Sequence, residues 1–235
     1  MKDVYLIRHG QAQSGPSGMD RDFFLTDQGQ GQAHELGQQL SKAGILVDRI
    51  YASRLTRARQ TAQILAQHVP APLTVRDDLI EHGSAVFLLE IDLIEAARRR
   101  PAALAPDGAL RVEPGSGAEL NWDYSVGGET LRALHGRAIK AFHEIEQAHH
   151  GSPDRIAIVA HGSILSAMLS EVLGLAPATV WRFQFACAAV FHLRYCEEEG
   201  QRTPVLCIHG PGGAFPQTND RSEKIQTPAA GQGNA

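Results

Sequence analysis

The sequence predicts an α/β fold in which βαβ units build a mainly parallel sheet. Short apolar runs typical of buried strands alternate with longer segments whose apolar residues recur at helical spacing. The runs at residues 4–7 and 156–160 each lead into a His-Gly dipeptide. Ligands of open α/β sheets bind outside the carboxyl ends of the strands, where loops carry the chemistry. Two strands that end this way therefore predict one shared site.

The first half of the chain alternates strands with amphipathic helices. Thr26 is a suitable N-cap for a helix that closes at Gly44, and short apolar segments at residues 50–52 and 73–75 predict two further strands. The apolar faces are marked by Ala33, Leu36 and Leu40 in the first helix, and by Leu55, Ala58, Ala62 and Leu65 in the second. Helices with such faces pack on a sheet.

The second half continues the pattern and closes it with two strands. A longer helix is marked by the apolar stripe Leu131, Leu134, Ala138, Phe142 and Ile145. His149 and His150 follow at its polar end, where we expect solvated side chains rather than metal ligands. Segments 188–193 and 204–208 look like closing strands that run antiparallel.

Three elements predict a phosphate site: Arg8-His9-Gly10, His161-Gly162 and the start of the helix after Ser53. Arg8-His9-Gly10 follows the first strand; an isolated histidine at a strand end often only satisfies backbone groups. However, Ser53 stands where it can cap a helix whose first turns carry three arginines, Arg54, Arg57 and Arg59. Cations are unfavourable at a helix N-terminus, so these arginines extend into solvent or reach a negative ligand held there.

The same residues resemble a known family. The sequence is similar to the histidine phosphatase superfamily, also called phosphoglycerate mutase-like, over roughly residues 3–210. The resemblance rests on five motifs in the family's order: Leu6-Ile7-Arg8-His9-Gly10, Ser53-x-Leu55-x-Arg57-Ala58-x-Gln60-Thr61-Ala62, Leu79-x-Glu81, Gly128-Glu129-Thr130 and Ala160-His161-Gly162. It implies a single three-layer α/β/α domain with helices on both faces of the sheet and a cap insertion.

The resemblance also implies the chemistry: hydrolysis of a phosphomonoester through a phosphohistidine intermediate. His9 is then the nucleophile and Glu81 the general acid and base, while His161 stabilises the transferring group. The phosphate-binding residues are Arg8, Arg57, His161 and Gly162. Because arginines supply the positive charge, no metal or other cofactor is required.

Departures from the family's pattern argue against a mutase. Gln11 stands where many relatives have glutamate, and Gly15 stands where mutases usually carry an asparagine. The sequence after Glu81 also departs from the pattern, which leaves His82 and Glu90 as competitors for the acid role. A cofactor-dependent phosphoglycerate mutase and a catalytically weak phospho-ligand binding protein remain the alternatives.

Composition sets further bounds on partners and location. The chain has 235 residues, 43% of them hydrophobic, and a formal net charge of -4, which gives no reason to expect nucleic acid or a membrane as partner. The expected partner is a small phosphomonoester or phosphoprotein substrate, and a homodimer is left open. The first strand begins within a few residues of the N-terminus, which favours a cytoplasmic location. The three cysteines, Cys187, Cys196 and Cys207, show no metal spacing and are expected to be buried.

The expected domain organisation is a phosphatase-like domain at residues 1–210 and a tail at 211–235. The cap insertion lies at about residues 82–127 and contains the Arg98-Arg99-Arg100 run. The tail is rich in Gly, Pro, Gln, Asn and Ser and has few apolar residues, so we expect it to be disordered.

Overall fold

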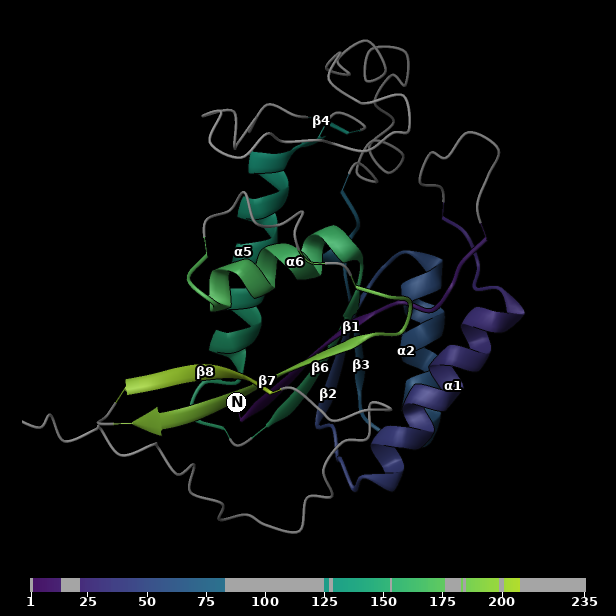
Figure 1. Ribbon diagram of the computed structural model, residues 1–235, viewed down its shortest axis with the longest axis horizontal. Helices are drawn as coiled ribbons and strands as arrows, with labels where there is room; N and C mark the ends of the chain where they lie inside the picture. The colour runs from purple at the N-terminus through teal and green to yellow at the C-terminus, as the bar shows by residue number, and fades with distance from the viewer. Residues whose placement is uncertain are drawn as a thin grey trace, which may run out of the picture.

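A computed structural model describes residues 2–13, 22–82, 125–126, 129–152, 154–175, 183, 185–198 and 201–207. A six-stranded sheet with the order β3-β2-β6-β1-β7-β8 lies at its centre (Figure 1). Its strands are β1 (Asp3–Arg8), β2 (Arg49–Ser53), β3 (Leu73–Arg76), β6 (Arg155–Ala160), β7 (Val190–Glu198) and β8 (Gln201–Cys207). β1, β2, β3 and β6 are parallel, whereas β7 and β8 are antiparallel additions at one edge. The predicted α/β class and the two antiparallel closing strands are confirmed.

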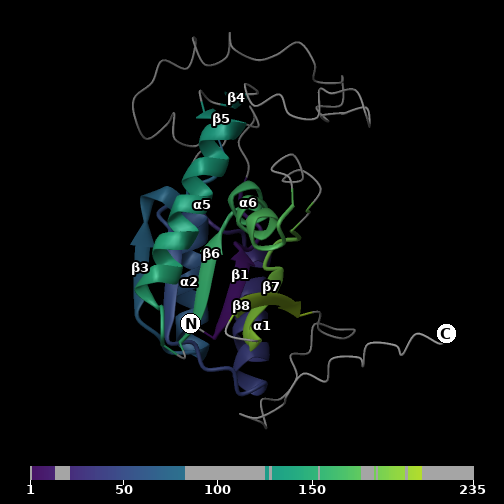
Figure 2. The same ribbon diagram turned by 90° about the vertical axis from the view of Figure 1, so that its left-hand side faces the viewer.

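Helices cover both faces of the sheet. They are α1 (Asp27–Lys42), α2 (Thr56–His68), α5 (Leu131–Ala148) and α6 (Gly162–Val172), with a 3-10 turn η1 (Asp77–Leu79) and a small hairpin of β4 (Ser125–Val126) and β5 (Glu129–Thr130). α1 and α2 lie on one side of the sheet, and α5 and α6 lie on the other (Figures 1 and 2). The structure thus has the three layers that were predicted.

The two cores follow from the alternation of side chains along the central strands. In β1, Val4 and Leu6 join the core under α5 and α6, whereas Tyr5 and Ile7 join the core under α1 and α2. Successive residues of a strand point to opposite faces, so a strand buried on both sides must be apolar throughout. This explains why β1 and β6 appear in the sequence as continuous apolar runs.

The strand order brings three carboxyl ends together. β6 lies between β1 and β2 and is parallel to both, with Arg8 opposite Ala160 and Ala52 opposite Val159. The residues that follow β1 and β6, and the last residue of β2, therefore meet at one edge of the sheet. This edge carries His9, His161 and Ser53.

A close backbone contact fixes the loop after β1. A Cβ atom at Gly10 would lie 2.4 Å from the carbonyl oxygen of Gly29, and one at Gly29 would lie 1.9 Å from the carbonyl oxygen of Gln11. The first turn of α1 therefore packs directly on the backbone that follows His9. Thr26 is the N-cap of α1, as predicted, and its side chain accepts a hydrogen bond from the Gly29 N–H.

The predictions for His149 and for the three cysteines were wrong. His149 is buried because its ring lies edge-on to the Tyr51 ring of β2 and joins the Tyr51 hydroxyl (3.0 Å) to the Asp154 carboxylate (2.6 Å). His150 is exposed, as predicted. The three cysteines are free and only half-buried, because they lie in or next to the antiparallel edge strands.

Much of the predicted domain organisation lies outside the described residues. The parts that lie outside are most of the proposed cap insertion, with the Arg98-Arg99-Arg100 run, and the whole of the tail at 211–235. None of the helices in the described ranges is long and apolar enough to cross a membrane.

The close contact at Gly29 gives a prediction with an internal control. Gly29→Ala should lower the free energy of unfolding by about 1–3 kcal/mol, as is typical when a methyl group is forced into a packed region. Gly31→Ala, two residues along the same helix, meets nothing within 4 Å and should instead raise it by about 0.5–1 kcal/mol. Urea unfolding of both variants is the measurement, and equal effects would contradict the close contact.

Candidate active site

His9 is held at the carboxyl end of β1 by backbone and side chain. Its N–H donates to the Ala160 carbonyl at 3.0 Å, and its own carbonyl accepts from the Ala188 N–H at 3.1 Å. The ring Nδ1 lies 2.7 Å from the Gly10 carbonyl oxygen. Because a carbonyl oxygen only accepts, Nδ1 carries the proton and Nε2 keeps its lone pair.

The environment keeps the His9 ring neutral. The side chain is buried, and burial is the main reason why its pKa falls from an ordinary value of 6.5 to about 3. The hydrogen bond to Gly10 opposes this shift, whereas the charges of Arg57 and Arg8 add to it. At neutral pH the imidazole is therefore unprotonated at Nε2.

Arg57, in the first turn of α2, lies beside His9. Arg57 is 4% exposed, and its Nε–H donates to His9 Nε2 at 3.2 Å.

The start of α2 differs from the prediction. Ser53 is not the N-cap: α2 begins at Thr56 after Leu55, which offers no side-chain oxygen. Instead, the Asp22 carboxylate accepts hydrogen bonds from the N–H and, at 2.8 Å, from the hydroxyl of Thr56. The negative group at this helix terminus is thus a side chain of the protein.

The other two arginines of this segment have different contacts. Arg54 forms an ion pair with Asp77 at 3.5 Å, and the exposed Arg59 donates to the Thr56 hydroxyl at 3.3 Å. Of the three predicted cations, Arg57 alone is hydrogen-bonded to His9 among the described contacts.

His161 faces His9 from the end of β6. The two rings have centroids 5.0 Å apart, and the His161 side chain is fully buried. Its Nε2 lies 2.8 Å from the Ser53 hydroxyl, whereas its buried Nδ1 has no hydrogen-bond partner within the described part of the chain. Burial, followed by the charge of Arg57, holds the pKa of His161 well below its ordinary value. Both histidines are therefore neutral in this structure.

Arg8 and Gly162 complete the group around the strand ends. Arg8 donates from Nη1 to the Phe185 carbonyl oxygen, and its buried Nε has no hydrogen-bond partner within the described ranges. Gly162 is the first residue of α6, whose N-cap residue, His161, forms no side-chain capping bond. The first N–H groups of a helix attract anions, and here they begin next to the two histidines.

Glu81 approaches the same region from the segment after β3. Its Oε1 accepts from the His82 N–H at 2.8 Å, and its Oε2 lies 4.0 Å from the position of a Cβ atom built on Gly162. The competitor His82 is turned to another partner, the Glu129 carbonyl at 2.9 Å, and burial lowers its pKa. The other competitor, Glu90, lies outside the described residues.

The residues proposed from sequence are thus brought together, along with two supporting hydroxyls. The Thr61 hydroxyl accepts from the Gly10 N–H at 3.1 Å and donates to the Arg57 carbonyl at 2.8 Å, so it links the loop that carries His9 to α2. Ser53 supports His161 as described above. Both stand in the motif of the second helix, but their roles depend on contacts across the sheet edge. The described residues contain no cluster of three or more His, Cys, Asp or Glu side chains suited to a metal ion.

A family model of the histidine phosphatase superfamily (branch 1) matches residues 4–205. The chain belongs to the histidine phosphatase superfamily. It is also 28% identical over 189 residues to the 2,3-bisphosphoglycerate-dependent phosphoglycerate mutase of Brucella melitensis, a match that covers 76% of this chain and 85% of the mutase.

Solved structures share the fold of this histidine phosphatase superfamily member. The α-ribazole phosphatase of Shigella flexneri has a TM-score of 0.61 at 19% identity, over 87% of this chain and 95% of that one. The mycobacterial glucosyl-3-phosphoglycerate phosphatase, solved with vanadate (VO3), has a TM-score of 0.59 at 20% identity, over 89% of this chain and 99% of that one. These likenesses establish the fold.

The lowered pKa of His9 predicts a specific pH dependence of stability. The unfolded chain binds a proton at His9 near pH 6.5 and the folded chain only near pH 3, so this residue contributes stability above pH 6.5 that is lost as the pH falls. Between about pH 6 and 4, wild type should lose up to about 1.4 kcal/mol more per pH unit than His9→Ala. Urea unfolding in phosphate-free buffer measures this, with the exposed His150→Ala as control. Parallel curves for wild type and His9→Ala would contradict the assignment.

Proposed function

We propose that this superfamily member is a phosphatase that hydrolyses phosphomonoesters through a phosphohistidine on His9. The observation that carries the proposal is the state of His9: a neutral ring whose proton is fixed at Nδ1 by Gly10, with Nε2 beside Arg57. A nucleophile needs an available lone pair, and a phosphate needs nearby positive charge. This geometry places both together: the Nε2 lone pair accepts from the Arg57 Nε–H here, and it becomes free to attack when that N–H turns to a phosphate oxygen.

In the first half-reaction, Nε2 of His9 attacks phosphorus as the bond from phosphorus to the ester oxygen breaks. Arg8 and Arg57 bind the non-bridging oxygens and balance their charge. The protonated carboxyl group of Glu81 gives its proton to the leaving oxygen, so the alcohol departs neutral and Glu81 becomes a carboxylate. The Nδ1 proton stays on the ring, hydrogen-bonded to Gly10.

In the second half-reaction, water attacks the phosphohistidine. The Glu81 carboxylate takes a proton from the water as its oxygen bonds to phosphorus, and the bond from phosphorus to Nε2 breaks. His9 returns to the neutral state, and Glu81 returns to the acid form needed for the next turnover. Inorganic phosphate is the product.

His161 acts in this scheme as a neutral donor. If the Ser53 hydroxyl donates to Nε2, the proton of His161 resides on Nδ1, the buried atom for which the described residues offer no partner. That N–H and the N–H of Gly162 then bind phosphate oxygens. Together with two arginines they supply the stabilisation that a metal would otherwise bring, so we propose a reaction that requires no metal ion.

A phosphoglycerate mutase is the second candidate, because the curated relatives include mutases at 28% identity. A mutase must keep its phosphorylated histidine away from water and return the group to product. In the sequence after His9, Gly15 stands where mutases usually carry an asparagine, which favours hydrolysis. A catalytically weak phospho-ligand binding protein is the remaining alternative.

The nucleophile is tested by trapping the intermediate. Brief incubation with labelled p-nitrophenyl phosphate, quenched in alkali, should leave about one labelled phosphoryl group per chain that is lost in acid. His9→Ala should lose both label and turnover, whereas the exposed His150→Ala should keep both. His161→Ala should keep the label but reduce kcat by about 10²- to 10³-fold, as for one lost electrostatic donor.

Three results would contradict the proposal. Label that persists in His9→Ala would remove His9 as nucleophile. Efficient formation of 2-phosphoglycerate from 3-phosphoglycerate, in the presence of bisphosphoglycerate, would establish the mutase instead. Labelling that requires a divalent cation and disappears in excess chelator would favour a metal-dependent reaction.

A further inference from the structure

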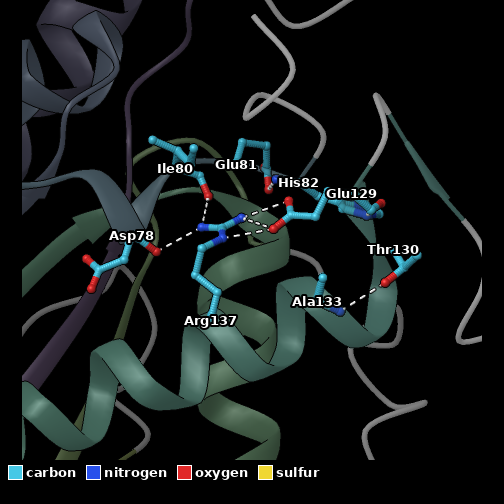
Figure 3. Close-up of polar contacts among 8 residues, drawn as sticks. All are labelled: Asp78, Ile80, Glu81, His82, Glu129, Thr130, Ala133 and Arg137. Atoms are coloured by element: carbon cyan, nitrogen blue, oxygen red, sulfur yellow. Dashed lines mark hydrogen bonds and ion pairs between the residues drawn. The ribbon is translucent and has the colours of Figure 1, made fainter. Parts of the chain in front are cut away.

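An arginine outside the predicted site makes a dense set of contacts next to Glu81. Arg137, in the second turn of α5, donates from Nε and Nη2 to the Glu129 carboxylate, both at 2.8 Å. Its Nη1 donates to two carbonyl oxygens, those of Asp78 and Ile80, again at 2.8 Å each. Figure 3 shows the guanidinium between the Glu129 carboxylate and these two carbonyls.

These contacts anchor the chain on both sides of Glu81. The carbonyl of the preceding residue, Ile80, is bound by Arg137, and the ring of the following residue, His82, is hydrogen-bonded to the Glu129 carbonyl. Between these two anchors, Glu81 has its backbone direction fixed, and its Oε1 accepts from the His82 N–H. The carboxylate thereby reaches the start of α6, beside Gly162.

The arrangement depends on the shape of a guanidinium. Arginine can fork onto a carboxylate and still donate from its remaining nitrogen, whereas the ammonium of lysine is a compact charge with three donors. Arg137 and Glu129 are 19% and 9% exposed, so water substitutes poorly for a lost contact. The general acid must reach one oxygen of the substrate. A displacement of about 1 Å in its position lowers the reaction rate by a factor on the order of 10².

We propose that Arg137 and Glu129 form a positioning pair that holds Glu81 in line with the leaving group. This inference rests on the proposed function, in which Glu81 is the acid. Neither residue contacts the reacting atoms in this account. Their effect is transmitted through the Ile80 carbonyl and the His82 ring.

A matched control is available on the same elements. Arg76 binds the Asp78 carboxylate (2.9 Å from Nε) and Glu144 (2.5 Å), so it also links the region after β3 to α5. Its side chain makes no described contact with Ile80 or His82. Arg76→Lys and Arg137→Lys therefore make the same chemical change in neighbouring ion pairs, only one of which holds the segment around Glu81.

The experiment measures the burst of phosphohistidine formation from two labelled substrates in rapid-quench mixing. p-Nitrophenolate leaves without a proton, whereas the alkoxide of glycerol 3-phosphate needs one, so loss of the acid slows the alkyl substrate selectively. Glu81→Gln defines this signature. Arg137→Lys and Glu129→Gln should slow the alkyl burst about 10- to 100-fold and the aryl burst less than about 3-fold. Arg76→Lys should leave the ratio of the two bursts unchanged.

The outcomes separate the inference from the proposed function. If Glu81→Gln shows the selective loss and the Arg137 and Glu129 variants slow both substrates equally or neither, the positioning pair is wrong and the acid assignment stands. If Glu81→Gln slows both equally, the acid assignment fails and the positioning pair fails with it. If Arg137→Lys does not fold, Glu129→Gln, which keeps the size and the backbone carbonyl, decides between these results. Absence of any burst in wild type would overturn the proposed function itself.

Discussion

The hydrogen bond between the His9 ring and the Gly10 carbonyl is the constraint on which the proposed chemistry depends. It fixes the proton at Nδ1 and leaves the lone pair of Nε2 directed at Arg57. The carbonyl is itself held in place, because residue 10 packs against the backbone of Gly29 and donates its N–H to Thr61. The orientation of one ring thus depends on a contact between the first loop and the start of α1.

The electrostatics of the site favour the binding of a dianion. Two arginines lie close to two buried histidines, and these charges and burial together keep both rings neutral. This grouping of positive charge is unfavourable without a bound anion, because the described side chains nearest to His9 are cations or neutral groups. Glu81, the acidic group of the site, is positioned near α6 and is held there by a separate network. The proposed mechanism needs this division between cations at the phosphate and an acid at the leaving group.

The sequence predicted the fold, and it predicted which side chains meet at one edge of the sheet, because both depend on local patterns. Apolar runs that end in His-Gly identify buried parallel strands and place their ends at one edge, and a Thr with helical spacing behind it marks the start of α1. The cap of α2 could not be predicted, because Asp22 lies 34 residues from Thr56 along the chain. Arg137 contacts the carbonyls of Ile80 and Asp78, which lie 57 and 59 positions earlier in the chain. No local pattern in a helix reveals such contacts.

The sequence drew attention to Glu129 and Ser53 but did not reveal which residues they contact. Glu129 stands in one of the five family motifs, yet its pairing with Arg137, eight residues later, requires β5 to lie beside the second turn of α5. Ser53 looked like a helix cap because it precedes a helix, whereas the register of β2 and β6 brings its hydroxyl to His161. Topology brings the side chains at the ends of these strands to one edge, but their individual partners depend on register.

The central claim is that the protein fixes which nitrogen of His9 reacts. Phosphorus NMR of the phosphoenzyme, prepared in alkali and digested to phosphohistidine, measures this directly because the two isomers have different spectra. The account predicts phosphate on Nε2 alone, since Nδ1 holds the proton bonded to Gly10. Phosphate on Nδ1, or on a residue other than His9, would contradict it.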